Sequence, residues 1–404
     1  MAARILVVDH IVPTPDQDSG SASAFSYLQI LSRAGFEMTF VPFNLVDGGK
    51  YADAVRALGI TVLGKTAYST IDEAVSKLAP PADLVILYRA PTAHPLLALV
   101  RSVAPNAKIL FHAVDLHHLR TKREAELTGS TALELAAKEL RDIELELVSR
   151  ADATIVVSAF ERDLLSKLEP HANVHFIPIL REAPPHPKLG WMARLVAVAG
   201  FARPVPRRRR DIVFVGGFLH QPNGDGIRWF ISEVWPKVLK AGTRNRLVVA
   251  GSNLPPDIAV LACDTIEMRG YVENLPSLFS GARLSIAPLR FGAGIKGKVV
   301  SSLSFGVPVV ATRVAAEGTG LVHGEHLLIG DTPEEMARLI ISLCQDDPLW
   351  WRLSDAGYAA FIQNFSHAAG AAKILGLVGS LLDRHSRVAD EPEAASEEER
   401  PPVA

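Results

Sequence analysis

The chain has 404 residues, of which 48% are hydrophobic and 21% charged, and its formal net charge is -2. This length predicts two domains, because a single hydrophobic core seldom grows so large. The small net charge argues against a general nucleic-acid binder. Cys263 and Cys344 have no ligand-spaced partners, which fits a reducing compartment and predicts no zinc site. The start of the chain lacks a signal-peptide pattern and no apolar run is long enough to span a bilayer, so we expect a cytoplasmic protein.

Short apolar runs alternate with helix-like stretches along the whole chain. In the first half the strand-like runs are 5–8, 38–42, 84–88, 109–112, 154–157 and 174–177, and the helix-like stretches are 22–33, 95–103, 133–149 and 161–168. In the second half the strand-like runs are 212–215, 247–250, 265–269, 284–287, 307–311 and 327–329, and the helix-like stretches are 227–239, 299–305 and 333–345. This alternation predicts an α/β fold with a helix-covered parallel sheet in each half.

The break between the two series, 184–210, is rich in proline and ends in four consecutive arginines. It predicts a linker between a domain over 1–183 and a domain over 211–369. The part 189–210 combines an apolar middle with basic flanks. It is interpreted either as a linker packed against its own domain or as a patch that rests on an anionic membrane surface. The Glu-, Pro- and Ala-rich tail, 388–404, is expected to be disordered.

The strongest motif is APLRFGAGIKGKVVSSLSFGVPVVAT, residues 287–312. A strand ends at its first residue, a loop follows, and then a helix begins. Ligands of open α/β sheets bind beyond the carboxyl ends of strands, where glycine N–H groups and helix N-termini attract anions. The loop carries Gly292, Gly294, Gly297, Lys296 and Lys298. The pattern predicts a site for a sugar-nucleotide diphosphate; the alternative is an ordinary glycine-rich turn with solvated lysines.

A second candidate group follows the first strand of the second half and comprises Gly216, Gly217, His220 and Asn223. The glycines allow a ligand or a facing domain to approach closely. His220 and Asn223 can donate hydrogen bonds to a phosphate or a sugar hydroxyl. Asn223 could equally cap the helix that follows.

Further candidates lie in the first half. The loop of Asp18, Ser19, Gly20 and Ser21 has the residue types of a capped helix start. In HAVDLHHLR, Asp115 and His117 are candidates for polarising an acceptor. Together with His118 they also suggest a metal site, and a plain charged loop is the remaining interpretation. The segment from Ser158 to Glu161 has a capping-box pattern, which predicts a structural role.

The pattern GxGIKxK followed by GxPVVAT resembles the donor-site signature of GT-B glycosyltransferases of the retaining, family-four type (glycosyltransferase group 1). APLRFGAGIKGK and AAEG are similar to a bacterial subgroup that is associated with surface-polysaccharide assembly. VPTPDQDSGS, VDLHHLR, FVGGFLHQPNGDGIRWF and LWWRLSDAGYAAFIQNFS resemble the same subgroup, so the likeness extends over nearly the whole chain. It implies a GT-B fold, in which two Rossmann-like doubly wound domains face each other across a cleft. We also expect a C-terminal helix, 370–387, that returns to the N-terminal domain.

In relatives, the loop that corresponds to 18–21 faces the cleft on the acceptor side, and backbone near Gly251, Tyr271 and Val272 meets the nucleobase. A plain strand-to-loop turn accounts for the latter three equally well. The resemblance implies no metal, because the positive loop replaces it. The donor-binding residues that it implies are Gly216, Gly217, His220, Asn223, Gly251, Tyr271, Val272, Arg290, Gly292, Gly294, Ile295, Lys296, Lys298, Ser301 and Glu317.

The sequence departs from the family at one point. Many relatives carry two glutamates, eight positions apart, that hold the donor sugar and the ribose, and the aligned positions here are Ala293 and Ser301. Ser301 could supply a weaker, neutral hydrogen bond. Glu317 is the nearest alternative carboxylate, although a surface glutamate at a helix start is the simpler interpretation.

The resemblance implies transfer of a sugar from a nucleotide-sugar donor to a glycan or lipid-linked acceptor in polysaccharide biosynthesis, with retention of configuration and without a cofactor. A nucleotide-sugar epimerase of the same fold is the second hypothesis, but no acid pair suited to proton abstraction is evident. A non-catalytic nucleotide-sugar-binding protein is the third, because both glutamates are missing. Neither first-strand turn contains GxGxxG, which disfavours an oxidoreductase.

Overall fold

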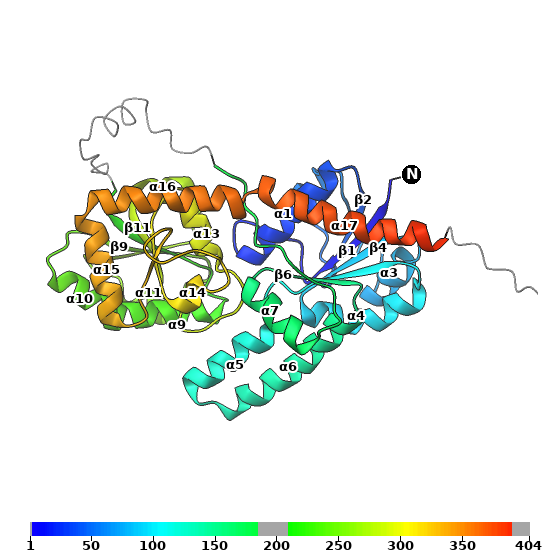
Figure 1. Cartoon of the computed structure of the whole chain (residues 1–404), viewed down its shortest axis with the longest axis horizontal. Helices are drawn as coiled ribbons and strands as arrows, with labels where there is room; N and C mark the ends of the chain where they lie inside the picture. The colour runs from blue at the N-terminus through cyan, green and yellow to red at the C-terminus, as the bar shows by residue number, and fades with distance from the viewer. Residues whose placement is uncertain (1, 185–208, 390–404) are drawn as a thin grey trace, which may run out of the picture.

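The computed structural model describes residues 2–184 and 209–389, with side chains as far as residue 382, and contains two α/β domains that lie side by side (Figure 1). The predicted membrane patch and the predicted tail fall almost wholly outside these residues. Each domain holds one sheet whose strand pairs are all parallel. In the described part of the chain, no helix combines the length and the hydropathy needed to cross a membrane.

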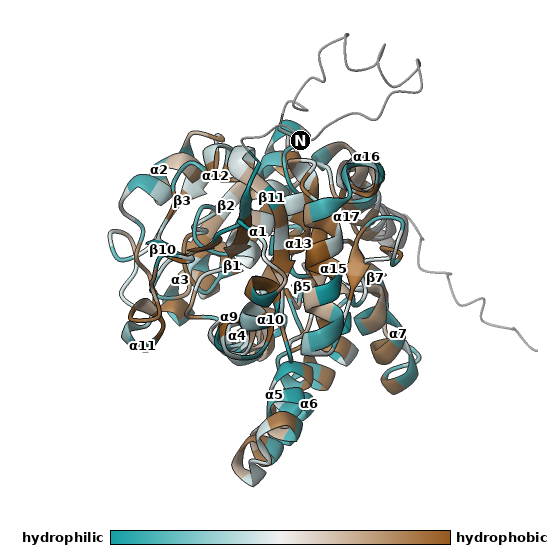
Figure 2. Cartoon of the chain, turned by 90° about the vertical axis from the view of Figure 1, so that its left-hand side faces the viewer, coloured by the Kyte–Doolittle hydropathy of each residue, from teal (hydrophilic) through white to brown (hydrophobic). Residues whose placement is uncertain are grey.

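The N-terminal sheet has the strand order β3-β2-β1-β4-β5-β6-β7. Its strands are β1 (Arg4–Asp9), β2 (Glu37–Pro42), β3 (Thr61–Val62), β4 (Leu84–Tyr88), β5 (Lys108–His112), β6 (Ala153–Val156) and β7 (Val174–Phe176). Its helices are α1 (Ser19–Arg33), α2 (Lys50–Arg56), α3 (Ile71–Leu78), α4 (Ala90–Val103), α5 (His117–Thr128), α6 (Thr131–Arg150) and α7 (Ala159–Leu168). The hairpin of α5 and α6 projects from the body of the domain (Figures 1 and 2).

The C-terminal sheet has the strand order β10-β9-β8-β11-β12-β13. Its strands are β8 (Asp211–Val215), β9 (Leu247–Ala250), β10 (Ile266–Gly270), β11 (Ala282–Ala287), β12 (Val309–Ala311) and β13 (Leu328–Ile329). Its helices are α9 (Gln221–Trp229), the π-helix η1 (Phe230–Val234), α10 (Trp235–Lys240), α11 (Pro256–Ala259), α12 (Leu275–Gly281), α13 (Gly297–Ser304), α14 (Arg313–Ala316), α15 (Pro333–Gln345) and α16 (Asp347–Asn364).

Alternating residues of the strands build a hydrophobic layer on each face of a sheet. In β1, Ile5 and Val7 join one cluster, which includes residues of α1, whereas Leu6 and Val8 join another, which includes residues of α3 and α4. Apolar residues therefore concentrate in the strands and inward helix faces (Figure 2). This confirms the predicted α/β class with helix-covered parallel sheets.

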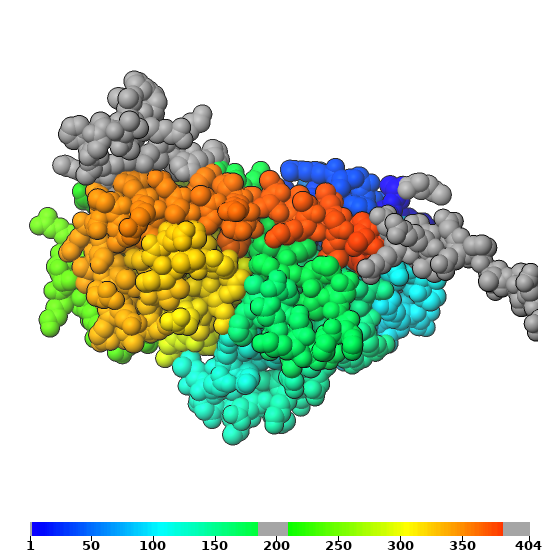
Figure 3. Space-filling view, viewed as in Figure 1, coloured from blue at the N-terminus to red at the C-terminus, as the bar shows by residue number. Residues whose placement is uncertain are grey.

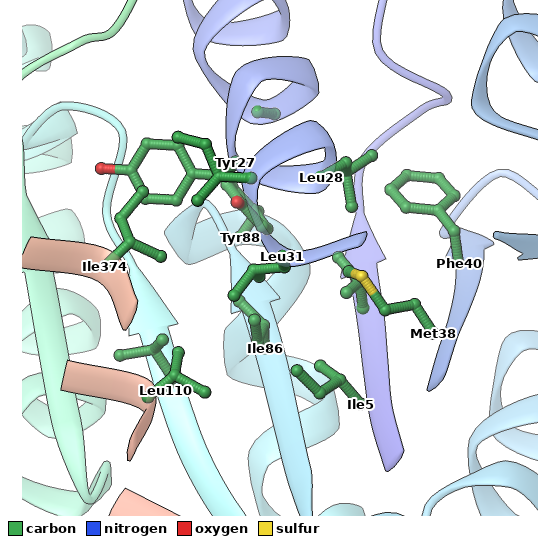
Figure 4. Packing of buried hydrophobic residues seen from close by; sticks show 14 of the residues in the cluster. Ile5, Tyr27, Leu28, Leu31, Met38, Phe40, Ile86, Tyr88, Leu110 and Ile374 are labelled. Carbon is green, nitrogen blue, oxygen red and sulfur yellow. The ribbon is translucent and has the colours of Figure 1, made fainter. Parts of the chain in front are cut away.

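The last helix, α17 (His367–Ala389), continues from α16 onto the N-terminal domain (Figures 1 and 3). Its residues Ile374, Leu377, Val378 and Leu381 are buried in the cluster that contains Tyr27 of α1 (Figure 4). Helix α17 therefore completes the core of the N-terminal domain, although it follows the C-terminal domain in sequence.

Several elements differ from the sequence-based expectation. Helix α4 begins at Ala90, five residues before the predicted start, and Pro95 lies inside it. The predicted helix over 227–239 is divided into α9, η1 and α10. Pro236, in the first turn of α10, has no N–H to donate, which disturbs the regular α-helical ladder there. Short elements such as β3 were not predicted, because two residues carry no periodic pattern.

Candidate functional site

The site is built from loops that follow the carboxyl ends of strands in both sheets. The main one, 288–296, joins β11 to α13 and is here called the donor loop. Gly292 has a φ of 147° and Gly294 a φ of 64°, which are backbone conformations that side chains disfavour. At these two positions the loop needs glycine to take its shape.

Lys296 lies at the end of the donor loop and is 5% exposed. Its Nζ donates to the carbonyl oxygens of Ala293 at 2.7 Å and Gly294 at 2.5 Å. Burial lowers its pKa to about 8, although the carboxylates of Glu161 and Glu317 act in the opposite direction. The ammonium group of Lys296 is thus hydrogen-bonded to the backbone of the loop in which Lys296 is the last residue.

Lys298 connects the donor loop region with the loop after β8. Its Nζ donates to Oδ1 of Asn223 at 2.7 Å, and Nδ2 of Asn223 donates to the Gly217 carbonyl at 2.7 Å. Burial and the charge of Lys296 lower the pKa of Lys298 to about 7. Asn223 lies inside α9, where His220 is the N-cap residue, so its side chain bridges these two loops and does not cap the helix.

Two of the predicted glycines permit a close approach of backbone. A Cβ atom on Gly216 would lie 2.8 Å from the Asn223 side chain, and one on Gly251 would lie 1.9 Å from the Gly216 carbonyl oxygen. A Cβ atom on Gly217 would lie 3.1 Å from the carbonyl oxygen of Gln17 in the N-terminal domain. The loops after β8 and β9 therefore pack tightly, and one of them reaches the opposite domain.

Asp115 and His117 lie where α5 begins, on the N-terminal side of the interface. Asp115 pairs with Arg120, and its Oδ1 is 3.4 Å from Nε2 of His117. Burial opposes ionisation of Asp115, but the charges of Arg120 and His117 outweigh it and lower its pKa. Burial lowers the pKa of the nearby His220 to about 4, against the attraction of Asp115. These residues form a charged cluster around a neutral imidazole.

Glu144 of α6 binds His118, the second histidine of the HAVDLHHLR motif. Its carboxylate is buried and accepts hydrogen bonds from the backbone N–H groups of His117 at 2.7 Å and His118 at 3.2 Å. It also contacts Nδ1 of His118 at 2.5 Å. His118 thus joins α5 to α6. Within the described ranges, no group of three or more His, Cys, Asp or Glu residues is arranged to hold a metal ion.

The acceptor-side loop combines a helix cap with an interface contact. Asp18 caps α1 by accepting a hydrogen bond from the Ser21 N–H at 2.8 Å. Ser19 accepts from Nη2 of Arg181 at 3.0 Å, and a Cβ on Gly297 would lie 1.5 Å from Ser19 Oγ. The starts of α1 and α13 therefore touch across the interface. Gly20 lies against the guanidinium group of Arg89.

The remaining predicted residues take several positions. Ile295 is buried in a hydrophobic cluster that also contains Val157 from the N-terminal domain. The hydroxyl of Tyr271 donates to Asp16 across the interface at 2.6 Å, which raises the pKa of Tyr271 to about 12. Val272 packs inside the C-terminal domain. Arg290 pairs with Asp225, with its Nε donating at 2.8 Å. Ser301 is half-buried on α13.

Glu317 is held by an arginine that the sequence did not single out. Arg123 of α5 donates to its two carboxylate oxygens at 2.8 and 2.9 Å, and also to the Gly292 carbonyl at 2.7 Å. The AAEG segment is thereby tied to the opposite domain. Nothing in the local spacing of Arg123 indicates this contact.

The capping-box prediction for Ser158 and Glu161 is wrong. The Ser158 side chain makes no capping hydrogen bond to α7. Oε1 of Glu161 accepts hydrogen bonds from the N–H groups of Leu116 at 3.0 Å and Gly294 at 2.9 Å. Burial raises the pKa of Glu161 to about 8. The Glu161 side chain therefore accepts hydrogen bonds from backbone N–H groups of two loops and not from the N-terminus of its own helix.

The C-terminal half of this arrangement has a recognisable sequence. Residues 209–346 match the family model described as glycosyl transferases group 1. We refer to these residues as the group 1 domain, after the model that they match. The group 1 domain contains the donor loop, both lysines and Asn223, as the sequence resemblance predicts. A 44.6 kDa protein in the cps region of Klebsiella pneumoniae is 29% identical over 141 residues, which are 33% of this chain and 36% of that relative.

Solved structures resemble the whole arrangement, including the group 1 domain. Sucrose-phosphate synthase from Thermosynechococcus elongatus has a TM-score of 0.70 at 16% identity, covering 95% of this chain and 100% of its own. HepE from Anabaena, in complex with UDP and glucose, has a TM-score of 0.68 at 14% identity, covering 93% and 99%. At these identities the likeness concerns the fold. The predicted GT-B fold, with two doubly wound domains, is confirmed.

Proposed function

We propose that the protein is a glycosyltransferase that moves a sugar from a nucleotide-sugar donor to a glycan or lipid-linked acceptor. One observation carries this proposal. The starts of α1 and α13 meet at the interface, beside the glycine-shaped donor loop with its buried Lys296 and beside the half-buried Lys298. Helix N-termini and desolvated cations together favour a diphosphate.

The proposed chemistry uses the same groups. When the glycosidic bond to the donor breaks, the departing nucleotide diphosphate gains negative charge, which Lys296, Lys298 and the α13 N-terminus would stabilise. Retention of configuration and catalysis without a metal belong to the proposal. Asp115 and His117 would orient or polarise the acceptor hydroxyl from the N-terminal domain.

The class of product rests on similarity. The relative from Klebsiella pneumoniae lies in a cps region, a polysaccharide gene cluster, and HepE was solved with UDP and glucose. We therefore propose a role in polysaccharide biosynthesis and UDP-sugars as the first donors to test. The proposed place of action is the cytoplasm, at its membrane face where the acceptor is lipid-linked.

A panel of UDP-, GDP-, ADP- and dTDP-sugars tests this function. A donor that binds the folded protein should raise its melting temperature, and an acceptor extract should then drive release of free nucleotide. Lys296→Ala should weaken donor binding by about 10- to 100-fold, the range expected for loss of a charge-assisted hydrogen bond. Lys237→Ala, on an exposed ion pair with Glu334, is the matched control. Absence of nucleotide release with every donor and acceptor would count against a transferase.

A further inference from the structure

The donor loop is held from outside its own domain at both ends of one tripeptide, Gly292 to Gly294. At the first end, Nη1 of Arg123 donates to the Gly292 carbonyl oxygen at 2.7 Å. At the other end, the Gly294 N–H donates to Oε1 of Glu161 at 2.9 Å. Both side chains come from the N-terminal domain, from α5 and α7. The residue between them, Ala293, is buried in a hydrophobic cluster of that same domain.

Each of the two side chains is itself anchored. The guanidinium group of Arg123 binds both oxygens of Glu317 and lies over the ring of Phe160, 5.2 Å from its centroid. Oε1 of Glu161 also accepts a hydrogen bond from the Leu116 N–H at 3.0 Å. A planar guanidinium donates hydrogen bonds in fixed directions, and Oε1 of Glu161 accepts two hydrogen bonds at once. These anchors therefore fix the position of the tripeptide.

The tripeptide in turn holds the cation. Lys296 Nζ donates to the carbonyl oxygens of Ala293 and Gly294. Displacement of this backbone would therefore displace the ammonium group. Arg123 and Glu161 thus act on Lys296 through the loop, without contacting it at hydrogen-bonding distance.

We propose that Arg123 and Glu161 are positioning residues: they hold the donor loop from the opposite domain, so that Lys296 is placed for the donor phosphates only when the domains are closed. This rests on the proposed function for the identity of the donor. One glutamate, Glu161, then binds the loop directly, and a second, Glu317, holds the Arg123 that binds it. Neither lies at the aligned positions of the family's glutamates, 293 and 301. A loop that is shaped by the facing domain couples donor grip to closure.

The first test measures loop order without turnover. Hydrogen exchange of amides 292–298 is followed in the ligand-free wild type, Arg123→Gln, Glu161→Ala and the exposed control Lys237→Gln. Loss of one clamp contact should speed exchange in this segment by about 5- to 10-fold, as expected for one hydrogen bond. Strands β1 and β4 should exchange as in wild type. Unchanged exchange at 292–298 in both variants would overturn the proposal.

The second test uses UDP-glucose kinetics. Arg123→Gln removes a charge-assisted contact, and Glu161→Ala leaves two backbone N–H groups without their acceptor, so each should raise KM for this donor by about 10-fold or more. Glu161→Gln keeps an acceptor for both N–H groups, so it should stay within about 3-fold of wild type. A KM for Glu161→Gln as poor as that of Glu161→Ala, or a wild-type KM in Arg123→Gln, would contradict the assignment.

The two proposals fail in different ways. If the wild type transfers sugar from no donor, the proposed function fails while the exchange experiment still tests the clamp. If the wild type is active and the clamp variants match it, only the clamp fails. Should Glu161→Ala not fold, Arg123→Gln decides alone, because Arg123 is less deeply buried, with a side chain 18% exposed.

Discussion

Lys298 is half-buried beside the cationic Lys296, and its pKa of about 7 places it near half-protonation in neutral solution. A bound diphosphate would favour the charged ammonium and raise that pKa. Binding should therefore take up a proton at a pH above about 7, and affinity should fall as the pH rises further.

Calorimetry with UDP in buffers of different ionisation enthalpy measures this proton uptake at pH 8. We expect about half a proton or more per UDP bound in the wild type. In Lys298→Met the proton uptake should fall to the part contributed by Lys296, whose pKa is about 8, and the affinity should drop. Equal proton uptake in wild type and Lys298→Met would assign the titration to another group.

Glu161 predicts a pH dependence of stability. Its pKa in the folded protein is about 8, above the ordinary 4.5, mainly because burial disfavours the charge, with Asp115 adding to the shift. The folded state then binds more protons than the unfolded state between these values. The stabilising contribution is present below about pH 4.5 and is lost as the pH rises toward 8.

Glu161→Gln removes this titration and retains an acceptor. The melting temperature of wild type relative to Glu161→Gln should be higher at pH 5 than at pH 8. Measurements stop at pH 8 because Lys296, whose pKa is lowered to about 8, acts in the opposite sense above it. A constant difference between the two melting curves would show that Glu161 is ionised throughout.

At the scale of elements, the contact between the starts of α1 and α13 decides how closely the domains approach. A methyl group on Gly297 would lie 1.5 Å from Ser19 Oγ and 2.6 Å from Ser19 Cβ. Two helix N-termini at this distance create a positive field but leave no space for a side chain. Glycine at 297 is therefore a requirement of the interface and not of α13 itself.

Gly297→Ala should lower kcat/KM about 10-fold or more, since overpacking of this kind costs on the order of 1–3 kcal/mol in the closed arrangement. Ser19→Gly in the same chain should restore part of the activity, because it removes both clashing atoms. Circular dichroism should show that each variant remains folded. Full activity of Gly297→Ala would mean that the closed contact is not needed for turnover.

At the scale of the molecule, α17 connects the two domains. It follows the group 1 domain in sequence but buries its apolar face in the core of the N-terminal domain (Figure 4). The stability of the first domain therefore depends on residues that follow the second domain in the sequence.

Leu377→Ala should lower the free energy of unfolding of the N-terminal domain by about 2–5 kcal/mol, the usual range for a buried leucine. Gly376→Ala is the matched control, because a Cβ there meets no atom within 4 Å. The control should be neutral or stabilising by up to about 1 kcal/mol. Urea unfolding followed by circular dichroism measures both, and equal midpoints would show that α17 contributes little.

The residue patterns also explain which predictions could be made. The predicted strand 284–287 corresponds to β11 and 247–250 to β9, because a buried parallel strand reads as a continuous apolar run. The clustering of glycine and lysine in the donor loop could also be recognised, because these residues are close together in the sequence. Short elements and the early start of α4 were not predicted, because tertiary packing outweighs the local secondary-structure propensity of those residues.

By itself, the sequence determined two helix-covered parallel sheets, their GT-B class and the position of the donor loop. The sheets and the loop follow from periodicity and spacing within a few dozen residues, and the GT-B class follows from the resemblance of the motifs to known glycosyltransferases. Only the tertiary structure decided that Glu161 binds Gly294 and that Arg123 binds Glu317, across separations of 133 and 194 residues. Such contacts leave no local pattern, because they depend on how two separately folded domains meet. The donor loop could be predicted from its sequence, whereas its contacts with Glu161 and Arg123 depend on the interface between the domains.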